Sequence, residues 1–142
     1  MDYLHQLEKI LESKYRIITI ESYDTDRVMD LFIQVSRFSN KAFYQAPPGE
    51  GMRRIGADHI VIPRTQTGTE KLRYIENSKH YGVYILRDFD AELDNKANIE
   101  LLKAIATGST PKVVILLSEY LNIPRELKPY TLRSKHQLKK AG

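Results

Sequence analysis

Apolar residues along the chain alternate between two spacings, and this alternation predicts strands and helices in turn. Nearly continuous apolar runs predict strands at residues 15–21 (YRIITIE), 82–88 (GVYILRD) and 112–118 (KVVILLS). A further strand is expected at residues 41–45 (KAFYQ). Continuous apolar runs are typical of strands that are covered on both faces, so we expect a sheet with helices on both sides.

The segments between these strands have the apolar spacing of helices. They predict helices at residues 2–13, 25–39 and 68–78, and a fourth helix that begins at Asp94 or Asn95 and ends at Gly108. Strands that alternate with helices of this length are typical of a parallel sheet. The pattern therefore predicts an α/β fold, a three-layer αβα sandwich with a mostly parallel sheet of about five strands.

Local signals mark the starts of two of these helices. Asp24 or Thr25 is placed to cap the helix at 25–39, and Thr67 with Glu70 fits a capping box for the helix at 68–78.

Three segments have weaker patterns. Residues 46–57 (APPGEGMRRIGA) contain two prolines and three glycines, so we expect a loop there. Residues 59–62 (HIVI) are expected to form a short strand or an extended edge segment. Residues 123–127 indicate one helical turn, and residues 130–132 a last short strand.

Length and composition limit the class of protein. The chain has 142 residues, of which 42% are hydrophobic and 28% charged, as in a soluble globular protein. We expect one domain over residues 1–132 and a flexible basic tail over residues 133–142. No apolar run reaches the ~20 residues of a membrane helix. Without cysteine the chain has no disulfide and no thiolate ligand. We expect a cytoplasmic protein with no membrane partner.

The positive charge is concentrated near the C-terminus. From Arg125 onward six basic residues accompany one acidic residue, and the whole chain has a net charge of +4. We interpret this region as a solvated tail. The alternative is a nucleic-acid-binding module that uses the basic tail to attract phosphates.

The strand at 82–88 leads into Arg87-Asp88-Phe89-Asp90. An acidic residue at the end of such a strand holds Mg²⁺ in P-loop nucleotide hydrolases, where a G-x-x-x-x-G-K-[ST] loop holds the phosphates. That loop occurs nowhere in the 142 residues. We therefore interpret Asp88 and Asp90 as residues that end the strand and cap the following turn, and we expect no ATPase activity.

Acidic residues also follow the first strand. If the first strand and the strand at 82–88 are close, Glu21 and Asp24 would lie near Asp88 and Asp90. Four carboxylates at strand ends would suit Mg²⁺ or Mn²⁺. A metal-dependent phosphoesterase or nuclease is therefore an alternative, and Mg is expected as a cofactor only in that case.

Other candidate residues are basic or polar. Arg53 and Arg54 lie in the glycine-rich loop, where they are suited to bind a phosphate or an acidic partner. Arg87 and Ser118 end two of the expected strands, and ligands of parallel sheets bind at such ends. We expect no catalytic residue among them.

The order of motifs also resembles a known family. The stretches that carry the resemblance are IITIESYDTDRVMDLF, EKLRYIEN, YGVYILRDFD and KVVILLSEYLNIPREL. They are similar to the N-terminal domain of a bacterial and plastid family of AAA ATPases, those related to a conserved hypothetical plastid reading frame. The resemblance implies a P-loop-like architecture in a non-catalytic, AAA-like domain that lacks the phosphate-binding loop.

We therefore expect a stand-alone, degenerate AAA-like domain that is non-enzymatic. Its expected role is protein interaction or regulation, through the loop with Arg53 and Arg54 and the strand ends around Asp24, Asp88 and Asp90. A protein partner is expected. Self-association is suggested only by analogy to ring-forming relatives.

Overall fold

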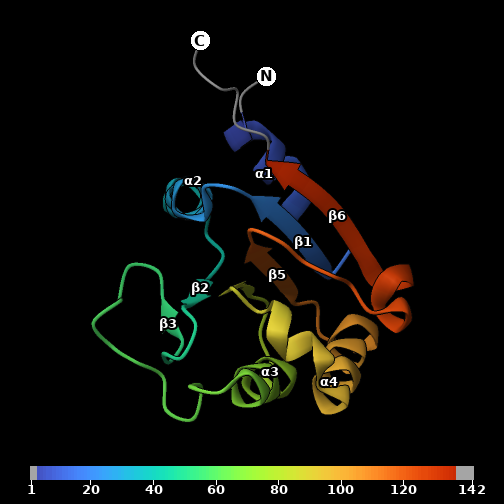
Figure 1. Cartoon of the computed structure of the whole chain (residues 1–142). Helices are drawn as coiled ribbons and strands as arrows, with labels where there is room; N and C mark the ends of the chain where they lie inside the picture. Colours follow the sequence, from blue (N-terminus) through green and yellow to red (C-terminus); the bar gives the residue numbers. More distant parts are fainter. Residues whose placement is uncertain (1–2, 137–142) are drawn as a thin grey trace.

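The structure, a computed structural model, describes residues 3–136 (Figure 1). Its helices are α1 (Tyr3–Leu11), α2 (Thr25–Arg37), α3 (Gly68–Asn77) and α4 (Lys96–Thr107), with the 3-10 helices η1 (Asp90–Asp94) and η2 (Arg125–Tyr130). Its strands are β1 (Ile17–Ser22), β2 (Phe43–Ala46), β3 (Arg53–Arg54), β4 (Val83–Arg87), β5 (Val113–Ser118) and β6 (Thr131–His136). None of the helices within residues 3–136 is long and apolar enough to cross a bilayer.

The six strands form one sheet in the order β3-β2-β4-β5-β1-β6. All neighbours are parallel except β3, which pairs antiparallel with β2. The expected α/β sandwich with a mostly parallel sheet is confirmed. The carboxyl ends of β2, β4, β5, β1 and β6 consequently lie along a single edge of the sheet.

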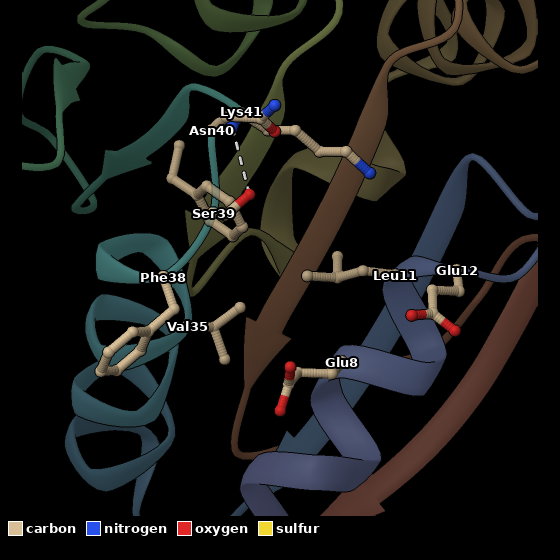
Figure 2. A pocket seen from close by; sticks show the side chains of 9 residues that line it. Glu8, Leu11, Glu12, Val35, Phe38, Ser39, Asn40 and Lys41 are labelled. Carbon is tan, nitrogen blue, oxygen red and sulfur yellow. Dashed lines mark hydrogen bonds between the residues drawn. The ribbon is translucent and has the colours of Figure 1, made fainter.

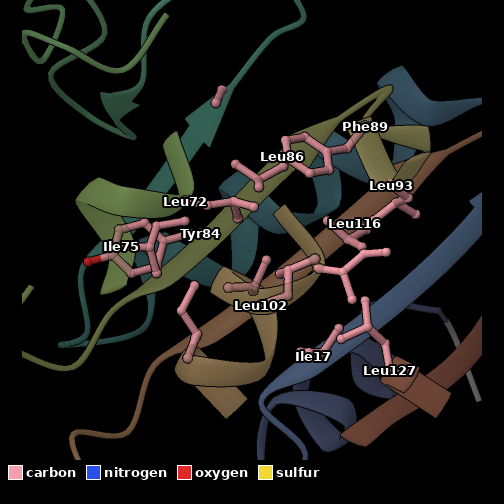
Figure 3. Packing of buried hydrophobic residues seen from close by; sticks show 14 of the residues in the cluster. Ile17, Leu72, Ile75, Tyr84, Leu86, Phe89, Leu93, Leu102, Leu116 and Leu127 are labelled. Atoms are coloured by element: carbon pink, nitrogen blue, oxygen red, sulfur yellow. The ribbon is translucent and has the colours of Figure 1, made fainter. Parts of the chain in front are cut away.

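Each face of the sheet is covered by its own helices. Leu7 of α1 and Phe32 of α2 pack on one face with Ile20 of β1. Leu102 of α4 packs on the other face with Leu116 of β5, in a cluster that also includes α3 and η2 (Figure 3). Successive strand residues point to opposite faces, so both faces need apolar residues, and this explains the continuous apolar runs.

Helix caps formed by local side chains agree with the sequence signals. The Asp24 carboxylate accepts a hydrogen bond from the Arg27 N–H and caps α2. Thr67 and Glu70 form both bonds of the capping box of α3. Such caps satisfy backbone donors that a helix leaves unpaired at its start.

Of the two alternatives expected for residues 59–62, a short strand or an extended edge segment, the strand is wrong. Those residues form a turn and an extended connection, in which the Ile60 N–H donates to the Ala57 carbonyl. The strand beside β2 is formed by Arg53 and Arg54 instead, opposite Gln45 and Tyr44. The glycines at 49, 51 and 56 flank this short pairing and allow the chain to turn on both sides of it.

The boundary of the basic tail is also corrected. Residues 133–136, expected in a flexible tail, belong to β6, which is longer than the strand expected at residues 130–132, and the sheet has six strands. All six residues of β6 pair in register with β1, from Ile17 opposite Thr131 to Ser22 opposite His136. The backbone hydrogen bonds of β1 on that side account for the order of this segment. The rest of the expected tail lies outside the described residues.

The packing of α1 gives a first prediction. Leu7 is fully buried between α1 and the sheet, whereas Gln6 of the same helix is exposed. Leu7→Ala should lower the free energy of unfolding by about 2–5 kcal/mol because it removes buried methyl groups and leaves a cavity. Gln6→Ala should change it by no more than about 0.5 kcal/mol. Urea unfolding monitored by circular dichroism measures both, and equal effects would contradict this packing of α1.

Candidate functional site

The topology selects one place on the carboxyl edge of the sheet. β1 and β5 are neighbours, but the chain leaves them on opposite faces. After β1 it continues into α2, and after β5 it continues through η2 in the other cluster. Ligands of open α/β sheets bind where neighbouring connections diverge in this way. The ends of β1 and β5 are therefore the expected ligand-binding position of this sheet.

A hollow of about 300 Å³ lies at this point. It is lined by Glu21, Ser22, Tyr23, Glu119, Tyr120, Lys135 and His136, and we call it the switch-point hollow. Tyr23 follows β1 and is 86% exposed, while Tyr120 follows β5 and is 66% exposed. Two large aromatic side chains thus stand in solvent beside the same hollow.

Glu21 lines the hollow and contacts the chain that follows β5. Its carboxylate accepts a hydrogen bond of 3.1 Å from the Leu121 N–H. The other carboxylate oxygen lies 4.0 Å from the ammonium nitrogen of Lys135 on β6. Glu21 therefore holds the 119–121 segment, which carries Tyr120, against the end of β1.

His136 closes the other side of the hollow. Its Nδ1 lies 2.9 Å from the Ser22 hydroxyl, and this hydroxyl also accepts from the Asp24 N–H at 3.0 Å. The imidazole packs against the Tyr3 ring of α1 in a tilted arrangement, with 4.2 Å between ring centroids and 36° between the ring planes. Burial lowers the pKa of His136, and the nearby Arg27 guanidinium lowers that pKa further, while Asp24 opposes the shift. The neutral imidazole thus joins α1, β1 and β6.

The start of α2 occupies the place where a P-loop ATPase binds phosphate. Only Tyr23 and Asp24 separate β1 from α2, so no phosphate-cradling loop can form between them. The Asp24 carboxylate bonds the Arg27 N–H at 3.1 Å. A helix start attracts anions through its free N–H groups and its dipole, and here a carboxylate of the chain itself takes that role.

Arg87 connects β4 to the same helix start. Its guanidinium donates to the Asp26 carboxylate at 2.5 Å and to the Thr25 hydroxyl at 3.0 Å. Asp88 follows with a φ of 52°, in the left-handed region, and its N–H donates to the Leu117 carbonyl at 2.9 Å. Arg87 therefore has a structural partner on α2, which links two segments at the carboxyl edge.

The four candidate metal carboxylates have separate environments. Glu21 bonds the 119–121 segment, Asp24 caps α2, and Asp90 begins η1. Asp88 is two strands from Glu21, with Ser118 of β5 between them, a backbone separation of roughly 10 Å. Within residues 3–136 no three His, Asp or Glu side chains are grouped closely enough to hold a metal ion.

The candidates in the glycine-rich loop lie at the far end of the sheet. Arg53 and Arg54 form β3, which is separated from β1 by three strands. The Arg53 guanidinium lies 3.4 Å from the Glu50 carboxylate. The fold thus does not bring these arginines to the switch-point hollow.

A second hollow, of about 380 Å³, lies between this loop and the end of β4. Its most buried polar group is Lys71 of α3, whose ammonium donates to the Pro47 carbonyl at 2.9 Å. Burial lowers the pKa of Lys71, while Glu92 and Glu50 raise it. Lys71 therefore fixes the start of the loop against α3.

A larger hollow lies away from the carboxyl edge. Its volume is about 480 Å³, and it lies between the C-terminal ends of α1 and α2 (Figure 2). Glu8, Glu12 and Lys41 are among its lining residues. It is near the amino ends of the strands, where α/β sheets do not place their ligands. Phe38 borders it and is 89% exposed.

The sequence matches a known protein family over most of its length. The model of the N-terminal domain of SpoVK-like AAA ATPases matches residues 3–135. The chain belongs to this family. The resemblance drawn from the sequence motifs is confirmed, because the match is to an N-terminal domain of AAA ATPases. No curated protein gave a significant match. The match covers every residue of the switch-point hollow except His136.

The sequence did not single out the residues that line the hollow beside Glu21. Tyr23 and Tyr120 follow the ends of buried strands, a position that could have marked them as exposed aromatics at the carboxyl edge. His136 had no such signal, because its partner Ser22 is 114 positions away in the sequence.

The separate environments of the carboxylates predict the response to metal. A ligand at 100 times its Kd stabilises a protein by ~2.7 kcal/mol, which raises the melting temperature by several degrees. We expect millimolar Mg²⁺ or Mn²⁺ to leave the melting temperature unchanged relative to EDTA. A rise that disappears in Asp88→Asn would show that the carboxylates do bind a metal.

The environment of His136 predicts the pH dependence of stability. Its folded-state pKa lies below the ordinary value, so the unfolded chain binds more protons as the pH falls through 6.5. The free energy of unfolding should therefore decrease from pH 7.5 to pH 5. His136→Gln should make this decrease smaller, and the exposed His59→Gln should not. Urea titrations at several pH values measure the slopes, and equal slopes would contradict the prediction.

Proposed function

We propose that this domain is a non-enzymatic interaction module of the SpoVK-like AAA ATPases, and that it binds a protein partner at the switch-point hollow. The observation that carries the proposal is the pair of exposed tyrosines, Tyr23 and Tyr120, beside a hollow at the ends of β1 and β5. Tyrosine is enriched in protein interfaces because it offers a large apolar ring and one polar group.

The start of α2 favours this role over nucleotide binding. In a P-loop domain the helix after the first strand offers its N-terminus to phosphates. Here the Asp24 carboxylate occupies that position, and Asp26 next to it pairs with Arg87. A nucleoside triphosphate would meet the Asp24 carboxylate there, without the lysine and the backbone cradle that bind it elsewhere.

The mixed polarity around the tyrosines suits a reversible protein contact. Glu119 is exposed beside Tyr120, and Lys135 borders the hollow from β6. Interfaces of this kind have aromatic residues at the centre and charged residues at the rim. We place the protein in the cytoplasm, and we propose that partner binding here regulates the ATPase of which such domains are part.

Photo-crosslinking in cells tests the surface directly. The photoreactive residue p-benzoylphenylalanine replaces Tyr23, Tyr120 or Phe38, one at a time, in the full chain. Phe38 is the control because it is also an exposed aromatic residue but follows the C-terminal end of α2, away from the carboxyl edge of the sheet. We expect the same protein to be crosslinked from positions 23 and 120, and not from position 38.

A second substitution distinguishes binding from chance collision. Tyr23→Ala, combined with the photoreactive residue at position 120, should lower the yield of that crosslink roughly tenfold, since central interface tyrosines carry much of the binding energy. Equal crosslinking from all three positions, or an unchanged yield in Tyr23→Ala, would refute the proposed surface.

A further inference from the structure

The sheet ends in one open edge. β6 is the last strand beside β1, and Figure 1 shows it (red) along the outer side of the sheet. Within residues 3–136 it pairs with β1 alone, and its outward N–H and C=O groups have no backbone partner from position 132 onward. The strand is six residues long, without proline or bulge. Such an edge can accept another strand.

The opposite edge is closed by contrast. β3 has two residues, and the loop that follows it is fastened back onto the chain. The Ile62 N–H donates to the Met52 carbonyl at 2.8 Å, and the Met52 N–H donates to the Thr65 hydroxyl at 2.7 Å. Short edge strands and covering loops are the usual protection against unwanted pairing. The loop thus covers the β3 edge, whereas within residues 3–136 the β6 edge is shielded by charged side chains and by no covering segment.

The side chains of β6 differ between its two faces. Leu132 packs with the α1 and α2 cluster and His136 packs against Tyr3, so the face toward α1 is largely occupied. Arg133 and Lys135 point to the other face, because side chains alternate along a strand. Both are exposed, and Arg133 has no ion pair within the described residues. Two cations therefore stand two residues apart along the open edge.

We propose that β6 binds an extended acidic segment of another protein, which adds to the sheet as a seventh strand. The backbone of that segment would pair with the free groups of β6. Acidic residues at alternate positions of the segment would lie beside Arg133 and Lys135, since residues i and i+2 of a strand are on the same face about 6.6 Å apart. Small or apolar residues between them would face Leu132.

Two other ligands of the β6 edge are disfavoured, a second copy of this chain and a nucleic acid. A second copy of this chain would bring its own Arg133 and Lys135 next to the same residues, and like charges across strands are destabilising. A nucleic acid would be attracted by the charges, but it has no peptide groups to pair with the strand edge. An acidic peptide can both pair with the two cations and hydrogen-bond to the backbone of the strand edge.

This surface is distinct from the tyrosines of the proposed function, although Lys135 and His136 also border the switch-point hollow. The two proposals can therefore fail separately. Peptide binding at β6 should persist in the Tyr23→Ala, Tyr120→Ala double variant. Loss of peptide binding in that variant would show that β6 is not an independent surface.

A peptide titration followed by NMR tests the inference on the full chain. The probe has the sequence SGTEVEVTGS, with acidic residues at alternate positions. The first control, SGTEEVVTGS, has the same composition but places its two acids on opposite faces. The second control has the probe sequence with N-methylated backbone amides at its four central residues. We expect amide shifts at residues 131–136 with the probe, affinity at least fivefold lower for the first control, and no binding of the second.

A charge variant tests the contribution of the basic residues. Arg133→Glu should lower affinity for the probe about fivefold, because it places like charges opposite each other. Arg73→Glu, an equal change on the exposed side of α3, should leave affinity unchanged. Equal effects of the two variants would indicate general charge attraction and would overturn the inference.

Three further results would overturn it. They are equal affinity for both unmodified peptides, binding of a single-stranded oligonucleotide at β6 in preference to the probe, and self-association in sedimentation experiments that shifts the amides of residues 131–136 without peptide.

Discussion

Parallel pairing on both sides of β1 is the constraint on which the rest of the structure depends. β5 pairs with β1 from Ile17 to Glu21, and β6 pairs with it from Ile17 to Ser22. These ladders bring the ends of three strands to the same level at the carboxyl edge. Tyr23, Tyr120 and His136 follow or end those strands, so their positions around the hollow result from backbone pairing. The side chains of the site then need little stabilisation of their own.

The domain satisfies two of its helix starts with its own side chains. Asp24 caps α2, and Thr67 with Glu70 caps α3. Each cap places an oxygen of the chain where an external anion could bind. Arg87, a candidate for ligand binding from the sequence, is paired with Asp26. An AAA-like scaffold built in this way has aromatic and charged side chains at its carboxyl edge, among them Tyr23, Tyr120 and Lys135.

The sequence was sufficient to predict strands and helix caps wherever the signal was local. The continuous apolar runs predicted β1, β4 and β5, and the caps at Asp24 and Thr67 were visible as short motifs. It was insufficient where partners are distant in the chain. β3 forms because Arg53 and Arg54 lie opposite β2 after a turn, and apolar content favoured residues 59–62 instead.

The candidate site was harder to predict from the sequence than the fold, because its residues are also distant from one another in the chain. The acidic residues of the strand ends were found, but their separation by an intervening strand follows from strand order, which no local pattern encodes. The bond between Ser22 and His136 joins residues 114 positions apart, and a segment of mixed polarity such as 133–136 has no strand signal by itself. Composition suggested a tail because its charges dominate that segment.

The order of the strands also has a consequence during synthesis. β1 is made before both of its neighbours, because β5 follows α4 in the chain and β6 follows β5. Contacts of such long sequence separation form slowly because loop closure must precede them. The nascent chain therefore carries an apolar strand with two open edges until β5 has been made, and with one open edge until β6 follows. Exposed strand edges of this kind promote aggregation during folding.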